Sequence, residues 1–146
     1  MATKQNEIVI YTDGACDPNP GRGGWGAIIV QDGRERILKG REAASTNNRM
    51  ELTAALQALK AVPSGKPVTL YTDSQYLKKG VEEWLPNWIA RGWRRKGGAL
   101  ANVELWQQLA NEITNHPITW KWVRGHNGNI YNERVDRIAR NAIRGR

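Results

Sequence analysis

Two stretches of this sequence end in the same three residues, Tyr-Thr-Asp. One runs from Glu7 to Asp13 and the other from Pro67 to Asp73, and each is rich in β-branched and aliphatic residues. Such a run predicts a strand buried on both faces, and its carboxyl end is where an open α/β sheet usually binds its ligand. Two carboxylates side by side repel each other unless a cation lies between them. The repeated ending therefore indicates a metal between Asp13 and Asp73, although either aspartate alone could simply end a strand or cap a helix.

Two further acids lie beside apolar residues at helical spacing. Glu51 immediately precedes a run over 52–59 in which leucine and alanine recur at i, i+3, i+4 and i+7, which predicts an amphipathic helix. Asp136 lies in the same way at the edge of an apolar stripe over 135–142. An acid at the edge of such a stripe is most often simply solvated, so neither residue predicts a site when it is taken alone.

The elements that must position these acids follow one another along the chain. Strands are predicted over 7–13, over 25–30, through Ile37 and Leu38, over 67–72 and over 118–123. Apolar residues at helical spacing predict helices over 52–59, 106–113 and 135–142, the first preceded by possible N-cap residues at 45–48. The order β-β-β-α-β-α-β-α predicts an α/β (mixed α+β) fold with a five-stranded mixed sheet flanked by helices. We expect one domain over residues 1–146.

The composition limits the possible classes of function. The chain has 22 Lys and Arg against 14 Asp and Glu, a net charge of +8, which favours polyanionic partners such as nucleic acid. No stretch approaches the length of a membrane span and no export signal begins the chain, so we expect a soluble, cytoplasmic protein with no membrane partner. One cysteine, Cys16, and two histidines cannot form a disulfide or a Cys/His zinc framework. Any metal must therefore be bound by oxygen.

Several ordered blocks of this sequence resemble the bacterial type 1 ribonuclease H family. They are Thr12–Cys16, Asn19–Gly21, Gly24–Ala27, Thr46–Leu52, Thr72–Tyr76, Trp122–His126 and Asn132–Asp136. The blocks are correctly spaced and span nearly the whole chain. The resemblance implies a ribonuclease H-like fold and an endonuclease that hydrolyses the RNA strand of RNA/DNA hybrids, leaving 5′-phosphate and 3′-hydroxyl ends.

The resemblance also implies roles for individual residues. The metal-binding and catalytic acids would be Asp13, Glu51, Asp73 and Asp136, and the catalytic histidine would be His126. Contacts to the hybrid would come from Asn19, Asn47, Asn48 and Gln75, with Thr46 matching a DNA-phosphate contact. Amide side chains both donate and accept, so they can address the 2′-hydroxyl that marks the RNA strand. Asn47 and Asn48 could also cap the following helix.

The chemistry of hydrolysis requires such a set independently of the family. In-line attack on a phosphodiester needs an activated water and charge stabilisation at the phosphorus and at the departing oxygen, which two divalent ions about 4 Å apart provide. Oxygen ligands select a hard cation, so we expect two Mg²⁺ ions, with Mn²⁺ as a possible substitute. His126 lies in a glycine-punctuated loop, where its side chain could carry a proton or could equally have no role.

A basic and aromatic segment over 78–96 is the expected grip on the DNA strand, and we call it the handle segment. By the resemblance, its substrate-binding residues would be Trp84, Trp88, Arg91, Trp93, Arg94, Arg95 and Lys96. Tryptophan clusters more often pack into cores, so we expect at least one of the three tryptophans to be buried. Two departures from the family pattern affect the expected strength of the grip, because Pro86 should interrupt the helix and the stretch Gly97–Ala101 replaces a more lysine-rich one.

Two alternative functions belong to other classes. A non-catalytic hybrid-binding module would keep the basic segment and lose acids, but all four acids are present. Another nuclease of the same superfamily, of the recombinase or transposase type, would need DNA-binding domains for which 146 residues leave no room. The sequence has no exposed heptad seam, so we expect a monomer.

Overall fold

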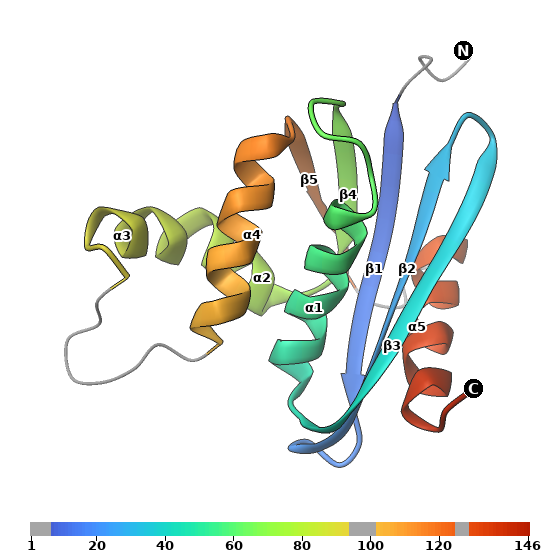
Figure 1. Ribbon diagram of the computed structural model, residues 1–146. Helices are drawn as coiled ribbons and strands as arrows, with labels where there is room; N and C mark the ends of the chain where they lie inside the picture. Colours follow the sequence, from blue (N-terminus) through green and yellow to red (C-terminus); the bar gives the residue numbers. More distant parts are fainter. Residues whose placement is uncertain (1–6, 94–101, 125–128) are drawn as a thin grey trace.

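A five-stranded mixed sheet forms the centre of the computed structural model, which describes residues 7–93, 102–124 and 129–146 (Figure 1). The strands are β1 (Ile8–Cys16), β2 (Gly21–Gln31), β3 (Arg34–Ser45), β4 (Val68–Thr72) and β5 (Ile118–Trp122). They lie in the order β3-β2-β1-β4-β5, with β1 antiparallel to β2 and parallel to β4. The predicted fold class is confirmed.

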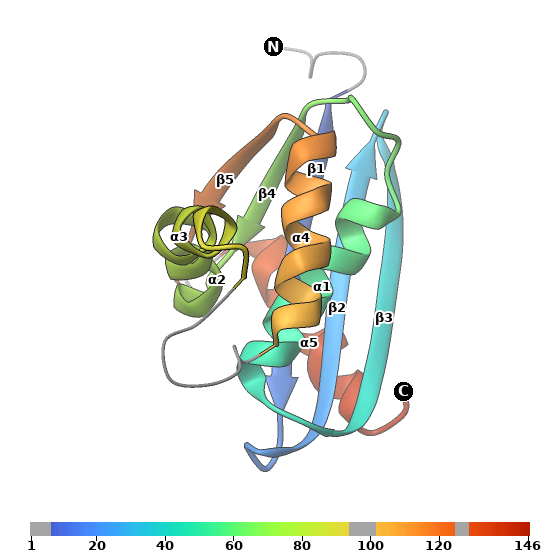
Figure 2. The same ribbon diagram turned by 60° about the vertical axis from the view of Figure 1, so that its left-hand side comes forward.

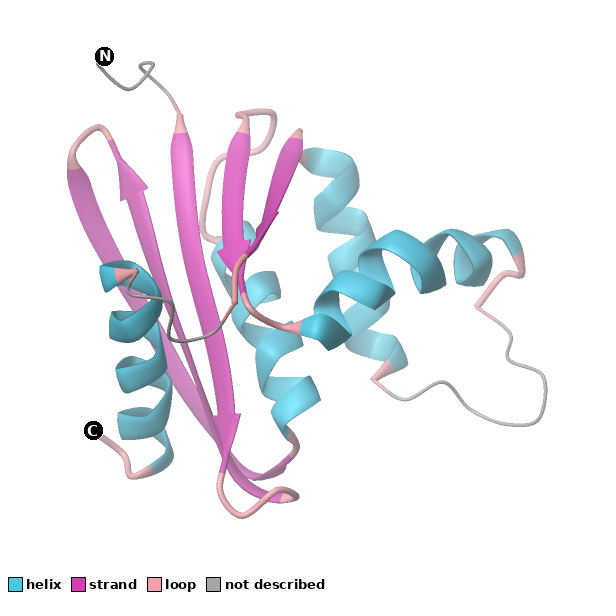
Figure 3. Ribbon diagram, turned by 180° about the vertical axis from the view of Figure 1, so that it is seen from behind, coloured by secondary structure: helices cyan, strands magenta, loops and turns pink. Residues whose placement is uncertain are grey.

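Helices cover both faces of this sheet. They are α1 (Asn47–Lys60), α2 (Gln75–Lys79), the π-helix η1 (Gly80–Trp84), α3 (Leu85–Ala90), α4 (Val103–Asn115) and α5 (Ile130–Ile143). α1 and α4 lie on one face and α5 lies alone on the other, while α3 projects away from the sheet (Figures 2 and 3). No helix of the described residues is long and apolar enough to cross a bilayer.

The main core lies between the sheet and the α1 and α4 helices. Its fully buried side chains include Ile10 of β1, Leu56 of α1, Leu70 of β4 and Trp106 of α4. Burying an aliphatic side chain of this size contributes about 1.5–3 kcal/mol to folding. α1 is held at its start by Thr46, whose hydroxyl accepts a hydrogen bond from the Arg49 N–H, and this anchored helix carries the next residues of the site.

Two elements differ from the sequence prediction. β3 continues to Ser45, well past the predicted segment through Ile37 and Leu38, because it pairs with β2 along its length although it is an exposed edge strand with a polar sequence. In the handle, the regular α-helix is interrupted before Pro86, as predicted, but the helical segment does not end there. A π turn, in which the Leu85 N–H bonds the Gly80 carbonyl, places Pro86 in the first turn of α3, where proline is tolerated.

Candidate functional site

Asp13 and Asp73 meet at one edge of the sheet because their strands are parallel neighbours. Tyr11 of β1 lies opposite Tyr71 of β4, and each aspartate follows its tyrosine by two positions. Asp13 is buried within β1, and Asp73 follows the last residue of β4. The repeated sequence ending therefore marks a real spatial pair.

Glu51 completes a compact group of three carboxylates. One oxygen from each of Asp13, Glu51 and Asp73 lies within 4.8 Å of the others. The first turns of α1 approach β1 so closely that a Cβ atom on Gly14 would overlap the backbone between Met50 and Glu51. A glycine at this position therefore allows the helix to deliver Glu51 to the strand.

The protonation of these acids reflects their burial. Burial, and next the negative charge of Asp73, together raise the pKa of Asp13 to about 8. Burial also raises the pKa of Glu51 well above its ordinary value, with Asp13 the next cause. In addition, Glu51 Oε2 is buried without a hydrogen-bond partner among the described residues. A buried oxygen without a partner among mutually repelling carboxylates fits a hard divalent cation, which would replace the missing donor and offset the repulsion.

Asp136 lies beside this group and not within it. It comes from α5 and lines the same cavity, of about 850 Å³, as Asp13, Glu51 and Asp73. Its charge contributes to the raised pKa of Asp13. Its Oδ2 atom lies 3.2 Å from Nε of Arg140 in an ion pair. The structure thus brings three of the four predicted acids into contact range and places the fourth on the cavity wall.

The predicted hybrid-contacting residues lie in the β1–β2 loop and at the first turns of α1 and α2. Asn19 in the β1–β2 loop accepts a hydrogen bond of 3.1 Å from the Asn47 N–H, which joins that loop to the start of α1. Asn47 lines the cavity, and Asn48 and Gln75 are exposed at the first turns of α1 and α2. The capping role considered for Asn47 and Asn48 belongs instead to Thr46, which leaves both amides exposed.

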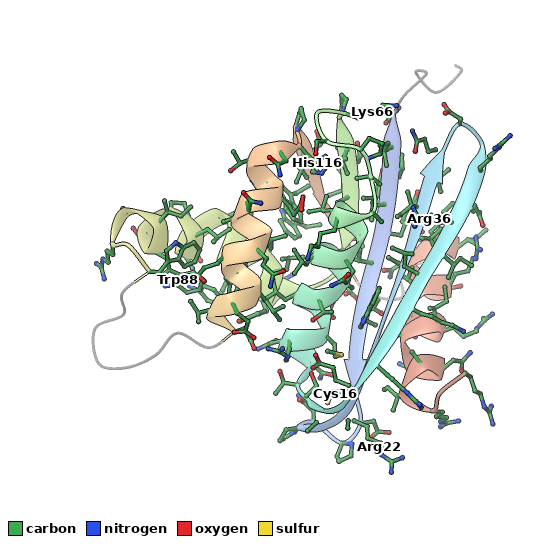
Figure 4. All side chains as sticks on the ribbon, in the orientation of Figure 1. Cys16, Arg22, Arg36, Lys66, Trp88 and His116 are labelled. Carbon is green, nitrogen blue, oxygen red and sulfur yellow. The ribbon has the colours of Figure 1, made fainter. Side chains whose placement is uncertain are left out.

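The handle segment is built on a tryptophan cluster. Trp84, Trp88 and Trp93 are all half-buried, so the expectation that at least one of them is buried was wrong. The buried residue is Trp106 of α4, whose ring centroid lies 5.6 Å from that of Trp88. Trp106 takes the interior position because α4 packs against α1. Trp88, labelled in Figure 4, lies between α3 and α4.

Of the remaining predicted site residues of the handle and the histidine loop, the structure describes Arg91. Arg91 is exposed just after α3. Arg94, Arg95, Lys96 and His126 lie outside the described residues.

Two features of the site were missed by reasoning from the sequence. Arg49 of α1 pairs with Glu42 at 3.0 Å and also with Glu104 of α4, so it ties the start of α1 to β3 and α4. Tyr131 of α5 stacks on Tyr11 of β1. The shared Tyr-Thr-Asp ending indicated that Tyr11 lies on the same strand face as Asp13, because residues two apart on a strand share a face. No sequence pattern predicted the contact made by Tyr131.

Comparisons with known proteins identify the family. The class that this fold and acid cluster define is the ribonuclease H class, and the RNase H family model matches residues 5–144. Ribonuclease H of Hahella chejuensis is 54% identical over 133 residues, 90% of each chain. Ribonuclease HI of Pseudomonas aeruginosa is 50% identical over 142 residues, 97% of this chain and 96% of the relative. The chain belongs to the ribonuclease H family, in its bacterial type 1 branch, as the sequence blocks predicted.

Solved structures agree with this assignment. The crystal structure of LC9-RNase H1, a type 1 RNase H with the type 2 active-site motif, superposes with a TM-score of 0.85 at 32% identity, covering 99% of this chain and 75% of that one. RNase H1 from the archaeon Halobacterium salinarum superposes with a TM-score of 0.71 at 22% identity, covering 96% of this chain and 99% of that one, which supports the fold alone.

Proposed function

We propose that this protein is a Mg²⁺-dependent endoribonuclease that hydrolyses the RNA strand of RNA/DNA hybrids and leaves 5′-phosphate and 3′-hydroxyl ends. The observation that carries the proposal is the group of Asp13, Glu51 and Asp73, with its unsatisfied buried oxygen, in a member of the ribonuclease H family. A non-catalytic binding module has no use for three converging carboxylates that repel one another, since their only effect there would be to destabilise the fold.

Asp13, Glu51 and Asp73 would hold the metal, with Asp136 completing the ligand set from α5. Two bound divalent ions, Mg²⁺ or Mn²⁺, would supply an activated water and would neutralise charge on the scissile phosphate and the departing 3′ oxygen. The chain's own contribution is to keep the four carboxylates aligned on β1, β4, α1 and α5 before substrate arrives. His126 would transfer a proton as the product leaves.

Recognition of the hybrid would use different residues for the two strands. Asn19, Asn47, Asn48 and Gln75 would read the RNA strand through its 2′-hydroxyls in the minor groove. The hydrogen bond from the Asn47 backbone N–H to the Asn19 side chain supports this role, because it holds the Asn19 amide against the start of α1, which carries Asn47 and Asn48. Thr46 would contact a DNA phosphate, and the handle segment would grip the DNA strand through Trp84, Trp88, Arg91, Trp93, Arg94, Arg95 and Lys96.

We further propose that the chain works in the cytoplasm as a single domain and as a monomer. The continuous match of one family model to residues 5–144 supports a single domain.

One assay tests the proposed activity. End-labelled RNA/DNA hybrid, duplex DNA and duplex RNA are each incubated with the protein in Mg²⁺ or in EDTA. We expect cleavage of the RNA strand of the hybrid in Mg²⁺ alone, with product ends that a 3′-end ligation identifies as hydroxyls. Cleavage of duplex DNA at a similar rate, or hybrid cleavage that persists in EDTA, would contradict the proposal.

A further inference from the structure

The α5 wall of the cavity carries arginines as well as Asp136. Six carboxylates line the cavity, and Arg137, Arg140 and Arg144 line it from α5. Arg140 is paired with Asp136. Arg137 and Arg144 are exposed, and within the described residues their side chains make no hydrogen bond or ion pair. Two arginines without a side-chain partner among the described residues therefore line a cavity that six carboxylates also line.

The three arginines form one stripe on the helix. At about 100° per residue, Arg137, Arg140 and Arg144 lie within an arc of about 100° that begins at Asp136. At a rise of about 1.5 Å per residue, Arg140 and Arg144 lie about 6 and 12 Å along the axis from Asp136. The stripe therefore leads from the acids toward the C-terminal end of α5.

This stripe is separate from the handle segment. α5 covers the sheet face opposite to α1 and α4, and the handle projects from the α4 side (Figures 2 and 3). Arginines on α5 and the helices α2 and α3 of the handle thus lie toward opposite faces of the sheet. A strand held at the acids by its scissile phosphate must continue along one of the cavity walls, and α5 supplies a wall with free guanidinium groups.

We infer that Arg137 and Arg144 bind phosphates of the RNA strand next to the scissile phosphate. This inference rests on the proposed function, which assigns the scissile phosphate to the RNA strand. Guanidinium groups suit the role because they bind phosphate oxygens in a bidentate manner and stay charged. They also offset the repulsion that six carboxylates would exert on an incoming polyanion. Arg140 cannot contribute equally while it remains paired with Asp136.

Binding as a function of salt tests this inference. Arg137→Ala, Arg144→Ala and the double variant are titrated with a labelled RNA/DNA hybrid in EDTA, where no cleavage occurs. Each single change should flatten the slope of log K against log salt by about one, and the double variant by about two. The matched control is Arg34→Ala, an exposed arginine without a side-chain partner among the described residues, at the start of β3 and outside this cavity. Slopes no flatter than that of the control would overturn the inference.

The assignment to the RNA strand needs a second experiment. Hybrids carrying neutral methylphosphonate linkages beside the cleavage site, in either the RNA or the DNA strand, are bound to the wild type and to the double variant. If the arginines contact the RNA strand, neutral RNA linkages should lower the hybrid affinity of the double variant less than that of the wild type. Neutral DNA linkages should lower both affinities equally. The reverse pattern would rule out the RNA strand.

A third measurement separates this inference from the proposed function. Wild type and double variant are compared in Mg²⁺ over a range of hybrid concentrations, where the loss of two phosphate contacts should raise the KM for the hybrid more than it lowers kcat. If the wild type fails to cleave any hybrid, the proposed function itself is contradicted. If the wild type cleaves the hybrid but the double variant has an unchanged salt slope, only the inference about the arginine contacts is contradicted. Unchanged melting temperatures would exclude unfolding as the cause of weaker binding.

Discussion

Tyr11 and Tyr71 stack face to face from neighbouring strands, with ring centroids 4.9 Å apart and ring planes 15° apart. Tyr131 of α5 lies on the other side of Tyr11, with centroids 4.3 Å apart and planes 10° apart. The stack therefore joins the two strands that lead to Asp13 and Asp73 to the helix that carries Asp136. Burial raises the pKa of the Tyr11 hydroxyl, so the central ring stays neutral under ordinary conditions.

This relationship predicts a positioning role for Tyr131. Tyr131→Ala should destabilise the protein by about 1–3 kcal/mol through lost stacking and burial. It should also lower kcat and raise the Mg²⁺ concentration needed for half-maximal rate, because α5 would hold Asp136 less firmly. Tyr131→Phe keeps the ring and should restore both values. Wild-type Mg²⁺ dependence in a destabilised Tyr131→Ala protein would show that the stack only supports the fold.

Replacing the central acid should separate chemistry from binding. Asp13→Asn removes a charge at nearly constant shape, so hybrid cleavage should be lost while the fold and hybrid affinity remain. Cleavage rates and binding constants of the wild type and of Asp13→Asn are compared in parallel. Activity within tenfold of the wild type would contradict the metal-site assignment.

The same acids predict how stability without metal depends on pH. The folded-state pKa of Asp13 is raised to about 8 from 3.8, so the folded protein binds a proton that the unfolded chain has released between these values. Stability in EDTA should therefore fall as pH rises from about 4 to about 8. Glu35 and Glu104 have lowered pKa values through their arginine partners, and their contribution is lost only as pH falls below about 4.5, which is below the pH range of the melting experiment that follows.

Thermal melting in EDTA between pH 5 and pH 9 measures this slope, with Asp13→Asn as the comparison. The variant should melt at a higher temperature than the wild type at pH 8 and should show a flatter pH dependence. Adding Mg²⁺ should stabilise the wild type more at pH 8 than at pH 5, because metal binding requires ionised carboxylates. A wild-type melting temperature that rises steadily with pH in EDTA would contradict the raised pKa values.

Loss of His126 should slow the reaction without removing metal. His126→Ala should cleave about 10²-fold more slowly, the usual scale for losing one general acid or base. The limb of the pH-rate profile that reports a group near neutrality should flatten. Calorimetry should give unchanged Mg²⁺ affinity. A variant that is as inactive as Asp13→Asn and fails to bind Mg²⁺ would make His126 a ligand or a structural residue.

The handle segment should act on affinity more than on turnover. Replacing Arg94 and Arg95 with alanine should weaken hybrid binding and flatten the salt dependence by about one unit per lost phosphate contact. Turnover at saturating hybrid should change little. A large fall in kcat with an unchanged salt slope would show that these residues do not grip phosphates.

Much of this protein could be predicted from local sequence patterns. Runs of β-branched and aliphatic residues predicted the five strands and period-3.6 patterns predicted the three long helices, because burial leaves a record in the residues of each element itself. The repeated Tyr-Thr-Asp ending predicted that Asp13 and Asp73 meet, since parallel neighbouring strands end at the same edge. Polar β3 was predicted too short because its backbone pairing with β2 leaves no comparable apolar record.

Tertiary packing decided which surfaces of those elements meet. From the sequence, Glu51 is expected to be solvated at the edge of the apolar stripe of its helix. Only the close approach of α1 to Gly14 makes it a buried partner of Asp13. Trp106, from a helix distant in sequence, takes the interior position that we expected one of the handle tryptophans to occupy. Likewise, Tyr131 reaches Tyr11 and the arginines of α5 reach the acid cavity only because α5 docks on β1 and β2. Such contacts join residues far apart in the chain, and no periodicity within one element encodes them.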